Sequence, residues 1–257
     1  MSVGPTPRGG TRPLSYREAV HSLASAQKPS SGAPAYSRLI NRPAGRLLAA
    51  VAYRAGLRPD AVTMLSGACS LMAIAVLALR APGWGTAVLT CGGLVVGYAL
   101  DSADGQLARL LGGGSAFGEW LDHMVDAVKI SALHLAVLIS MYRFFELSNA
   151  GWLLVPVGFA LVAAVMFFGL ILIDLLRRDF PRDAPRASQP SGWVRSLLVL
   201  PSDYGLLCVI FLLLGVRQAF LGAYAVLLLG NAVLLALAVR KWGAELKAID
   251  LLRAERV

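Results

Sequence analysis

Six stretches of mainly apolar residues, separated by short polar connectors, dominate the sequence. Each approaches or exceeds the roughly 20 helical residues that cross about 30 Å of membrane hydrocarbon. The stretches cover residues 61–80, 84–106, 118–141, 150–175, 197–216 and 219–239. Connectors such as Ala81-Pro82-Gly83 are short, which favours antiparallel neighbours in one bundle. The pattern therefore predicts an all-α integral membrane protein with a bundle of six transmembrane helices over residues 58–241.

The segments outside this bundle have a different pattern. Residues 1–35 are rich in Pro, Gly and Ser, which predicts a mostly disordered cytoplasmic N-terminal tail. In residues 36–57 apolar residues recur among arginines, which predicts an amphipathic helix lying in the membrane interface. A helix packed on the bundle is the alternative for that segment. Residues 242–257 are predicted to form a cytoplasmic C-terminal tail.

Composition and charge support a multi-pass membrane protein. Hydrophobic residues make up 57% of the chain and charged residues only 15%, which is too apolar for an ordinary soluble domain. The net charge of +9 comes from Lys and Arg that flank the apolar stretches, so we expect contact with anionic lipids rather than nucleic acid. The alternate connectors contain few basic residues, and their only Lys or Arg residues are Arg80, Arg143 and Arg217. By the positive-inside rule, both termini then face the cytoplasm.

Four carboxylates interrupt the apolar pattern and need a reason, because ionised groups at membrane depth usually mark a functional site. Asp101 and Asp104 share one helix face at i, i+3, and Asp122 and Asp126 share another at i, i+4. Two helices can therefore point two carboxylates each at a common point. Such acids would repel one another unless a cation lay between them.

The chemistry around these acids suggests a metal-bound pyrophosphate. Carboxylate oxygens suit Mg²⁺, Mn²⁺ or Ca²⁺ better than zinc, and charge balance favours two ions. Gly105, Ala108 and Gly118 have little side-chain volume beside the acids, which leaves room for a bulky anion. Arg109 adds a permanent cation that suits a phosphate group. The four acids and this arginine lie toward the predicted cytoplasmic side.

These residues form a pattern that resembles the signature of the CDP-alcohol phosphotransferase family. The spacing Asp-x2-Asp-Gly-x2-Ala-Arg-x8-Gly-x3-Asp-x3-Asp matches at all eight fixed positions, from Asp101 to Asp126. Residues 59–63 also resemble a Pro-Asn-x-x-Thr segment of the family, with Asp60 in place of Asn. The resemblance implies a membrane transferase in phospholipid biosynthesis. It would move a phosphatidyl or other phospho-alcohol group from a CDP-alcohol, favoured as CDP-diacylglycerol, to a second alcohol, and release CMP.

The resemblance also implies roles for individual residues. Two Mg²⁺ or Mn²⁺ ions would be held by four carboxylates, those of Asp101, Asp104, Asp122 and Asp126. Asp126 would additionally act as the catalytic base that accepts the proton of the attacking hydroxyl. The cytidine diphosphate would be bound by Gly105, Ala108, Arg109, Gly118 and Thr63.

The acceptor alcohol is less well defined by the sequence. Residues 28–32 and 37–43 resemble a segment of family members that handle inositol phosphates, so an inositol phosphate is the favoured acceptor, with glycerol phosphate another. Asp203, Lys129 and Arg195 are candidate acceptor ligands. Each has an alternative: Asp203 as a helix N-terminal feature, Lys129 as a counter-charge for the acids, and Arg195 as ordinary positive-inside charge.

Two other classes of protein and one question of assembly stay open on the sequence alone. A UbiA-like prenyltransferase also uses aspartate-rich motifs, and a cation- or proton-coupled transporter also uses intramembrane acids. Neither class explains the Gly-x2-Ala-Arg spacing after Asp104. Gly93 and Gly97 match a small-xxx-small motif, which indicates either packing within the bundle or the seam of a homodimer. Cys69, Cys91 and Cys208 occur singly, which favours packing over a zinc site or a disulfide framework.

Overall fold

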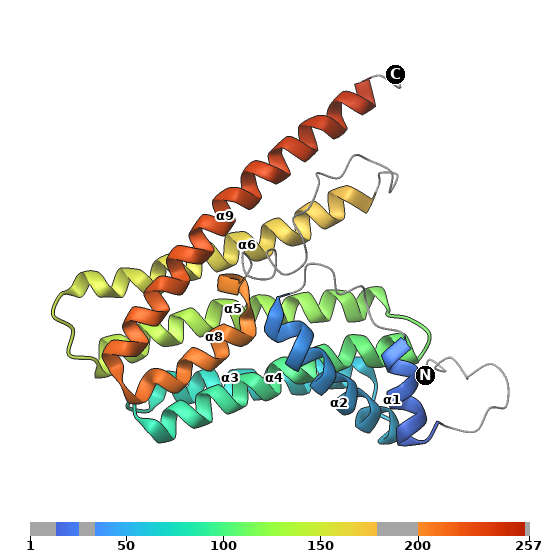
Figure 1. Ribbon diagram of the computed structural model, residues 1–257, viewed down its shortest axis with the longest axis horizontal. Coiled ribbons are helices and arrows are strands. Elements are labelled where there is room, and N and C mark those ends of the chain that lie inside the picture. Colours follow the sequence, from blue (N-terminus) through green and yellow to red (C-terminus); the bar gives the residue numbers. More distant parts are fainter. Residues whose placement is uncertain (1–13, 26–33, 179–199, 255–257) are drawn as a thin grey trace.

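The computed structural model describes residues 14–25, 34–178 and 200–254, and every regular element within these ranges is helical (Figure 1). The α-helices are α1 (Tyr16–Ser25), α2 (Arg42–Arg54), α3 (Pro59–Leu79), α4 (Trp84–Leu110), α5 (Ala116–Phe144), α6 (Leu154–Arg178), α8 (Tyr204–Ile210) and α9 (Arg217–Ala254). Short 3-10 or π-helical turns are η1 (Ser37–Asn41), η2 (Ala150–Leu153), η3 (Leu200–Ser202) and η4 (Phe211–Gly215).

Five helices within the described ranges are long and apolar enough to cross a membrane. They are Pro59–Leu79, Trp84–Leu110, Ala116–Phe144, Ala150–Arg177 and Arg217–Asp250. These helices confirm the all-α class and five of the expected apolar spans. The stretch expected at 197–216 contains only the shorter apolar helix Tyr204–Gly215, and residues 197–199 lie outside the described part. The count of six spans therefore stays a prediction.

The helices form a bundle from which two long members extend. Helix α3 packs along α4, and α5 packs on α3, while α2 covers another side of α4. Helix α6 packs on α5 and α9 packs on α6 (Figure 1). In the view of Figure 1 the last turns of α9 project beyond the other helices, above the end of α6. The Arg177 guanidinium on α6 forms an ion pair with Glu245 on α9 in that extension.

Close backbone approach joins α3 to α4 at the small-xxx-small motif. A Cβ atom placed on Gly93 would lie 2.7 Å from the Ala73 Cβ, and one on Gly97 would collide with the Ser70 side chain. The Ser66 hydroxyl donates to the Gly97 carbonyl oxygen at 2.8 Å. The motif therefore packs within the bundle, and these contacts favour that interpretation over a homodimer seam.

A methyl group at Gly93 has no room, so we expect Gly93→Val to destabilise the bundle by about 1–3 kcal/mol through overpacking. Thermal unfolding of the detergent-purified variant measures the effect as a lowered midpoint. Gly92→Val is the matched control, because a Cβ atom there meets no atom of the described residues within 4 Å. Equal unfolding midpoints for the two variants would contradict the packing role of Gly93.

Part of the predicted N-terminal tail is a packed helix, so the prediction of disorder is wrong for residues 16–25. Ser15 and Glu18 form a reciprocal capping box: Ser15 N–H donates to Glu18 Oε2 at 2.7 Å, and Glu18 N–H donates to Ser15 Oγ at 3.3 Å. Ala19 and Leu23, spaced i, i+4, are buried in a small core with residues of α2, α3 and α4. Residues 1–13 and 26–33 lie outside the described part.

The segment expected to lie in the interface packs on the bundle along one face. Ala49 and Ala50 of α2 are fully buried, and α2 contacts α1 and α4. The opposite face exposes apolar side chains, including those of Leu47 and Val51. This helix therefore fits the packed alternative, while its exposed apolar face keeps an interfacial position as a prediction.

The segment predicted as the C-terminal tail is helical as far as the structure describes it, and its cytoplasmic position stays a prediction. Helix α9 continues without a break through Trp242 and Gly243 to Ala254. Residues 244–254 are mostly good helix formers (Ala, Glu, Leu, Lys), which explains why one glycine does not end the helix. Residues 255–257 lie outside the described part.

Candidate active site

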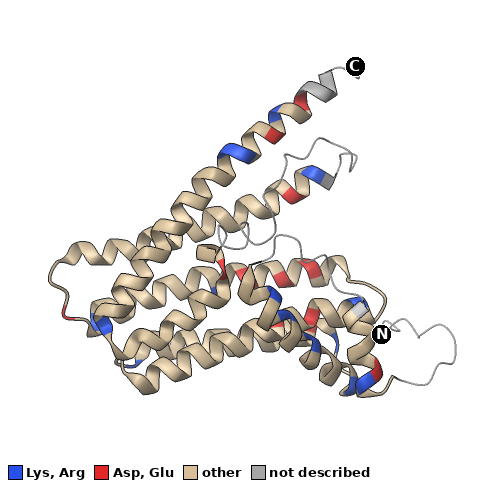
Figure 2. Cartoon of the chain, viewed as in Figure 1, with Lys and Arg blue, Asp and Glu red and all other residues tan. Residues whose placement is uncertain are grey.

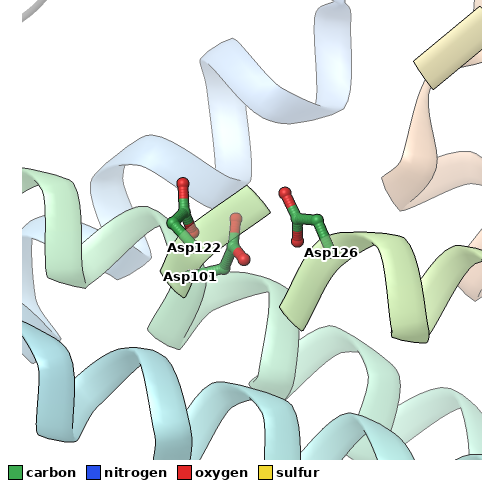
Figure 3. A group of neighbouring side chains, drawn as sticks. All are labelled: Asp101, Asp122 and Asp126. Atoms are coloured by element: carbon green, nitrogen blue, oxygen red, sulfur yellow. The ribbon is translucent and has the colours of Figure 1, made fainter. Parts of the chain in front are cut away.

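Three carboxylates of the acid motif meet between α4 and α5. Asp101 on α4 and Asp122 and Asp126 on α5 each offer an oxygen, and these oxygens lie within 4.8 Å of one another. Figure 3 shows the three side chains gathered between the two helices. The i, i+4 spacing puts Asp122 and Asp126 on one face of α5, as the sequence predicted. All three side chains are partly exposed, so a ligand can reach them.

The turn between α4 and α5 sets this meeting. Gly112 and Gly113 have φ angles of 100° and 131°, which side chains rarely tolerate, so glycine suits both positions. Ser115 then caps α5, because its hydroxyl accepts a hydrogen bond from Gly118 N–H at 2.9 Å. A tight turn followed by a defined helix start fixes the register of the Asp122 and Asp126 side chains against Asp101.

Asp104 lies apart from this group of three. Its carboxylate is buried, accepts a hydrogen bond from the Thr63 hydroxyl at 2.6 Å, and also accepts one from Gly105 N–H. Thr63 on α3 is itself 3% exposed. In this conformation Thr63 therefore orients Asp104. The role predicted for Thr63 in binding cytidine diphosphate stays a prediction.

Lys129 supplies a cation to the acid group. Its ammonium lies 2.6 Å from Asp101 Oδ1 and 2.7 Å from Asp126 Oδ1, and its side chain is only 8% exposed. One Lys129 side chain therefore bridges α4 and α5. These contacts favour the charge-balancing interpretation of Lys129 over that of a ligand for the acceptor.

Small residues leave open space beside Arg109. Among the described residues, a Cβ atom on Gly105 would meet only the Arg109 Nη1 within 4 Å, at 3.6 Å. A Cβ atom on Gly118 would lie 3.1 Å from Ser115 Oγ and 3.3 Å from Asp60 Oδ1. Gly118 thus lets the start of α5 approach the start of α3. Ala108 and Arg109 are half-buried on the last turns of α4, next to this region.

Sequence reasoning missed a contact that holds α2 against the acid-bearing helix. Gln106, a variable position within the motif, is 2% exposed, and its side-chain amide donates to the Arg42 carbonyl oxygen and to Ser102 Oγ, each at 3.1 Å. Gly45 permits this approach, since a Cβ atom there would lie 2.6 Å from Ser102 Oγ. The sequence offers no signal for this contact, because Gln106 shares its helix face with the polar Ser102 and Arg109 and its burial is visible only in the structure.

Asp203 has a position that suits helix capping. It is fully buried, and its carboxylate accepts hydrogen bonds from Gly205 N–H at 3.1 Å and from Tyr36 N–H at 2.8 Å. It therefore joins the start of α8 to the chain just before η1. Burial raises the pKa of the Tyr36 phenol above its ordinary value, and the Tyr36 ring stacks on Tyr98 with centroids 6.3 Å apart. This geometry favours the alternative in which Asp203 is a helix N-cap.

Only some of the other residues predicted to bind the acceptor lie in the described part of the structure. Arg195 and residues 28–32 lie outside the described part. The segment 37–43, which resembles part of family members that handle inositol phosphates, forms η1 and the first turn of α2. This segment contacts α4 and α8, so it lies against the helix that carries Asp101.

Solved structures with the same fold include two of phosphatidylinositol phosphate synthase (PgsA1) from Mycobacterium tuberculosis. The structure with CDP-DAG bound matches with a TM-score of 0.53 and 20% identity, and the match covers 79% of this chain and 93% of that chain. The structure in complex with manganese and citrate matches with a TM-score of 0.52 and 20% identity, over 76% and 87% of the two chains. At this identity the likeness establishes the fold.

The sequence matches a family model over most of its length. Residues 57–242 match the model described as CDP-alcohol phosphatidyltransferase. That range contains the whole acid motif and the five long apolar helices up to Trp242. The family match therefore rules out the prenyltransferase and transporter interpretations. Among curated proteins, no sequence match was found. The chain is therefore a membrane enzyme that belongs to the CDP-alcohol phosphatidyltransferase family.

Proposed function

We propose that this enzyme transfers a phosphatidyl group from CDP-diacylglycerol, as the favoured CDP-alcohol donor, to an acceptor alcohol and releases CMP. The observation that carries the proposal is the meeting of Asp101, Asp122 and Asp126 within 4.8 Å between α4 and α5. A family of CDP-alcohol enzymes and a fold neighbour with CDP-DAG bound support the choice of donor. A soluble CDP-alcohol is the second candidate donor.

The donor atoms fit a divalent cation. Three carboxylate oxygens in a partly buried group match the hard ligands that Mg²⁺ and Mn²⁺ prefer, and a fold neighbour was solved with manganese. Asp101, Asp122 and Asp126 would hold the cation, and Asp104 would join them if two ions bind. Such a cation would neutralise charge on the diphosphate and acidify the acceptor hydroxyl.

Individual side chains are proposed to accept the proton, bind the diphosphate and orient the metal ligands. Asp126 accepts the proton of the attacking hydroxyl through the carboxylate oxygen that Lys129 does not contact, since Lys129 contacts Oδ1. Arg109 binds the diphosphate through its guanidinium, which suits phosphate oxygens. Gly105 keeps the space beside Arg109 free of a side chain, Ala108 adds little volume there, and Gly118 lets the start of α5 approach Asp60 on α3. Thr63 orients Asp104.

An inositol phosphate is the acceptor that the proposal favours, with glycerol phosphate as the alternative. Support comes from the resemblance of residues 37–43 to a segment of family members that handle inositol phosphates. The structure places this segment against α4. Arg195 remains a candidate ligand for the acceptor phosphate, because a guanidinium suits that group.

The site is proposed to face the cytoplasm. Figure 2 shows Lys, Arg, Asp and Glu gathered around α1, α2 and the far ends of α6 and α9, with few at the opposite end of the bundle. Arg143 lies in the last turn of α5, at the end opposite Asp122 and Asp126, and Arg217 begins α9. The positive-inside rule assigns the richly basic end to the cytoplasm, where nucleotide substrates occur.

A direct assay tests the reaction. Purified enzyme in lipid nanodiscs is incubated with CDP-diacylglycerol, Mg²⁺ or Mn²⁺, and one acceptor at a time: inositol phosphate, glycerol phosphate or a free polyol. We expect metal-dependent CMP release and one new phospholipid, which mass spectrometry identifies. Release of CMP only from a soluble CDP-alcohol would replace the proposed donor, and absence of CMP with every donor would overturn the proposed function.

A further inference from the structure

The Lys129 ammonium occupies a position between two carboxylates that we assign to the metal site. It contacts Asp101 Oδ1 on α4 at 2.6 Å and Asp126 Oδ1 on α5 at 2.7 Å. The whole Lys129 residue is only 6% exposed, and lysine side chains are rarely buried without a partner. Two anions, one from each helix, offset the cost of taking this cation out of water.

The position of Lys129 on α5 directs its ammonium toward both carboxylates. Asp126 and Lys129 are spaced i, i+3, so one helical turn directs both side chains to the same side. Asp101 reaches them from the neighbouring helix. The lysine therefore joins the two helices at the level of the acid group, where three close carboxylates would otherwise repel one another.

We propose that Lys129 is a positioning residue that holds Asp101 and Asp126 together before metal binds and competes with the divalent cation for their oxygens. The proposal rests on the proposed function, in which these aspartates are metal ligands. In the metal-free enzyme, Lys129 stabilises the acid group. When the cation binds, the same ammonium repels it, so Lys129 lowers the affinity of the site for metal.

The competition follows from the atoms involved. Lys129 contacts one oxygen of each carboxylate, so a cation that takes those oxygens must displace the ammonium, and a cation that takes the others lies close to it. A like charge a few ångströms away in a poorly solvated site raises the energy of the bound cation substantially. Removing the charge of Lys129 should therefore strengthen metal binding. A residue that only supported the fold would, when removed, weaken metal binding or leave it unchanged.

The test uses the full-length enzyme in nanodiscs and Mn²⁺ alone as the probe. Calorimetry and electron paramagnetic resonance measure the Mn²⁺ affinity, and thermal unfolding in EDTA measures metal-free stability. We expect Lys129→Met to bind Mn²⁺ at least roughly tenfold more tightly than wild type, given the size of close charge repulsion. We expect the same variant to unfold at a lower temperature in EDTA, and Mn²⁺ to raise its midpoint more than it raises that of wild type.

Three further variants test whether the effect on Mn²⁺ affinity comes from the charge of Lys129. Lys129→Arg keeps the positive charge, so its Mn²⁺ affinity should stay below that of Lys129→Met. Lys241→Met removes one positive charge from the half-exposed side chain near Glu245 and should leave Mn²⁺ affinity unchanged. Lys129→Gln, which retains polar contact without charge, replaces Lys129→Met if that variant does not fold.

The outcomes separate this proposal from the proposed function. Unchanged or weakened Mn²⁺ binding in both uncharged Lys129 variants would overturn the competition, while the metal site itself would stand. Lack of saturable Mn²⁺ binding in wild type, or equal binding in Asp122→Asn, would instead overturn the metal site and with it the proposed function.

Discussion

Asp126→Asn is expected to lower CMP release from CDP-diacylglycerol by about 10²–10⁴-fold, the range typical for loss of a general base. The amide cannot accept the proton of the attacking hydroxyl, although it keeps the size of the carboxylate. The measurement is the rate of CMP release at saturating donor, acceptor and Mn²⁺. Saturating metal matters, because the variant also removes one of the three carboxylates that meet between α4 and α5.

A matched variant separates the base from general effects of charge. Asp250→Asn makes the same chemical change at an exposed position near the end of α9, and its rate should equal that of wild type. Asp122→Asn removes a carboxylate of the same group without the proposed base. We expect its loss of rate to be partly recovered by raising the Mn²⁺ concentration, whereas that of Asp126→Asn is not. Undiminished CMP release by Asp126→Asn would contradict the assignment of the base.

The meeting of acids on two helices could be predicted because it depends on local geometry. Asp122 and Asp126 lie four residues apart on one helix, and a short glycine-rich turn brings that helix back beside Asp101. Helical period and connector length are both visible in the sequence. The position of Asp104 could not be predicted from helical spacing alone. Its spacing from Asp101 suggested a fourth member of the group, yet the Thr63 hydroxyl of a third helix binds its carboxylate.

The flanks were predicted less well because composition hid local signals. A Pro-, Gly- and Ser-rich average over residues 1–35 suggested disorder, whereas Ser15 and Glu18 carry the capping box that starts α1. The buried Ala19 and Leu23 then dock the helix on its neighbours. Similarly, residues 242–257 were assigned to a tail, and α9 continues through the described part of that segment because nothing in it ends a helix. Average polarity therefore located the membrane core but not the helix ends.

Contacts between segments far apart in the sequence could not be predicted at all. The Tyr36 N–H reaches Asp203 across 167 residues, and the Gln106 amide reaches the Arg42 carbonyl oxygen across 64. Neither contact has a periodic pattern, because each depends on how complete helices pack. Both hold the N-terminal segment against the bundle, with α4 and α8 as the helices that it meets.

Asp203→Ala is expected to destabilise the enzyme strongly because it leaves a buried donor, Gly205 N–H, and a partly buried one, Tyr36 N–H, without their partner. The carboxylate accepts hydrogen bonds from Gly205 N–H and Tyr36 N–H in a fully buried position. Each unsatisfied buried donor costs about 1–3 kcal/mol, so the free energy of unfolding should fall by roughly 2–5 kcal/mol. Thermal unfolding in nanodiscs with EDTA measures the loss. Asp203→Asn, which retains one accepting oxygen, should lose roughly half as much stability.

The same variant decides between capping and a role in binding the acceptor. If Asp203 caps α8 and anchors the chain before η1, the folded fraction of Asp203→Asn should keep the KM for the acceptor alcohol, because the side chain has no exposed surface. If Asp203 instead contacts the acceptor, that KM should rise while the unfolding temperature stays near that of wild type. Measuring both quantities on one preparation matters, since a lowered fraction of folded enzyme reduces the maximal rate but not the KM. Unchanged stability together with a raised acceptor KM would therefore return Asp203 to the acceptor site.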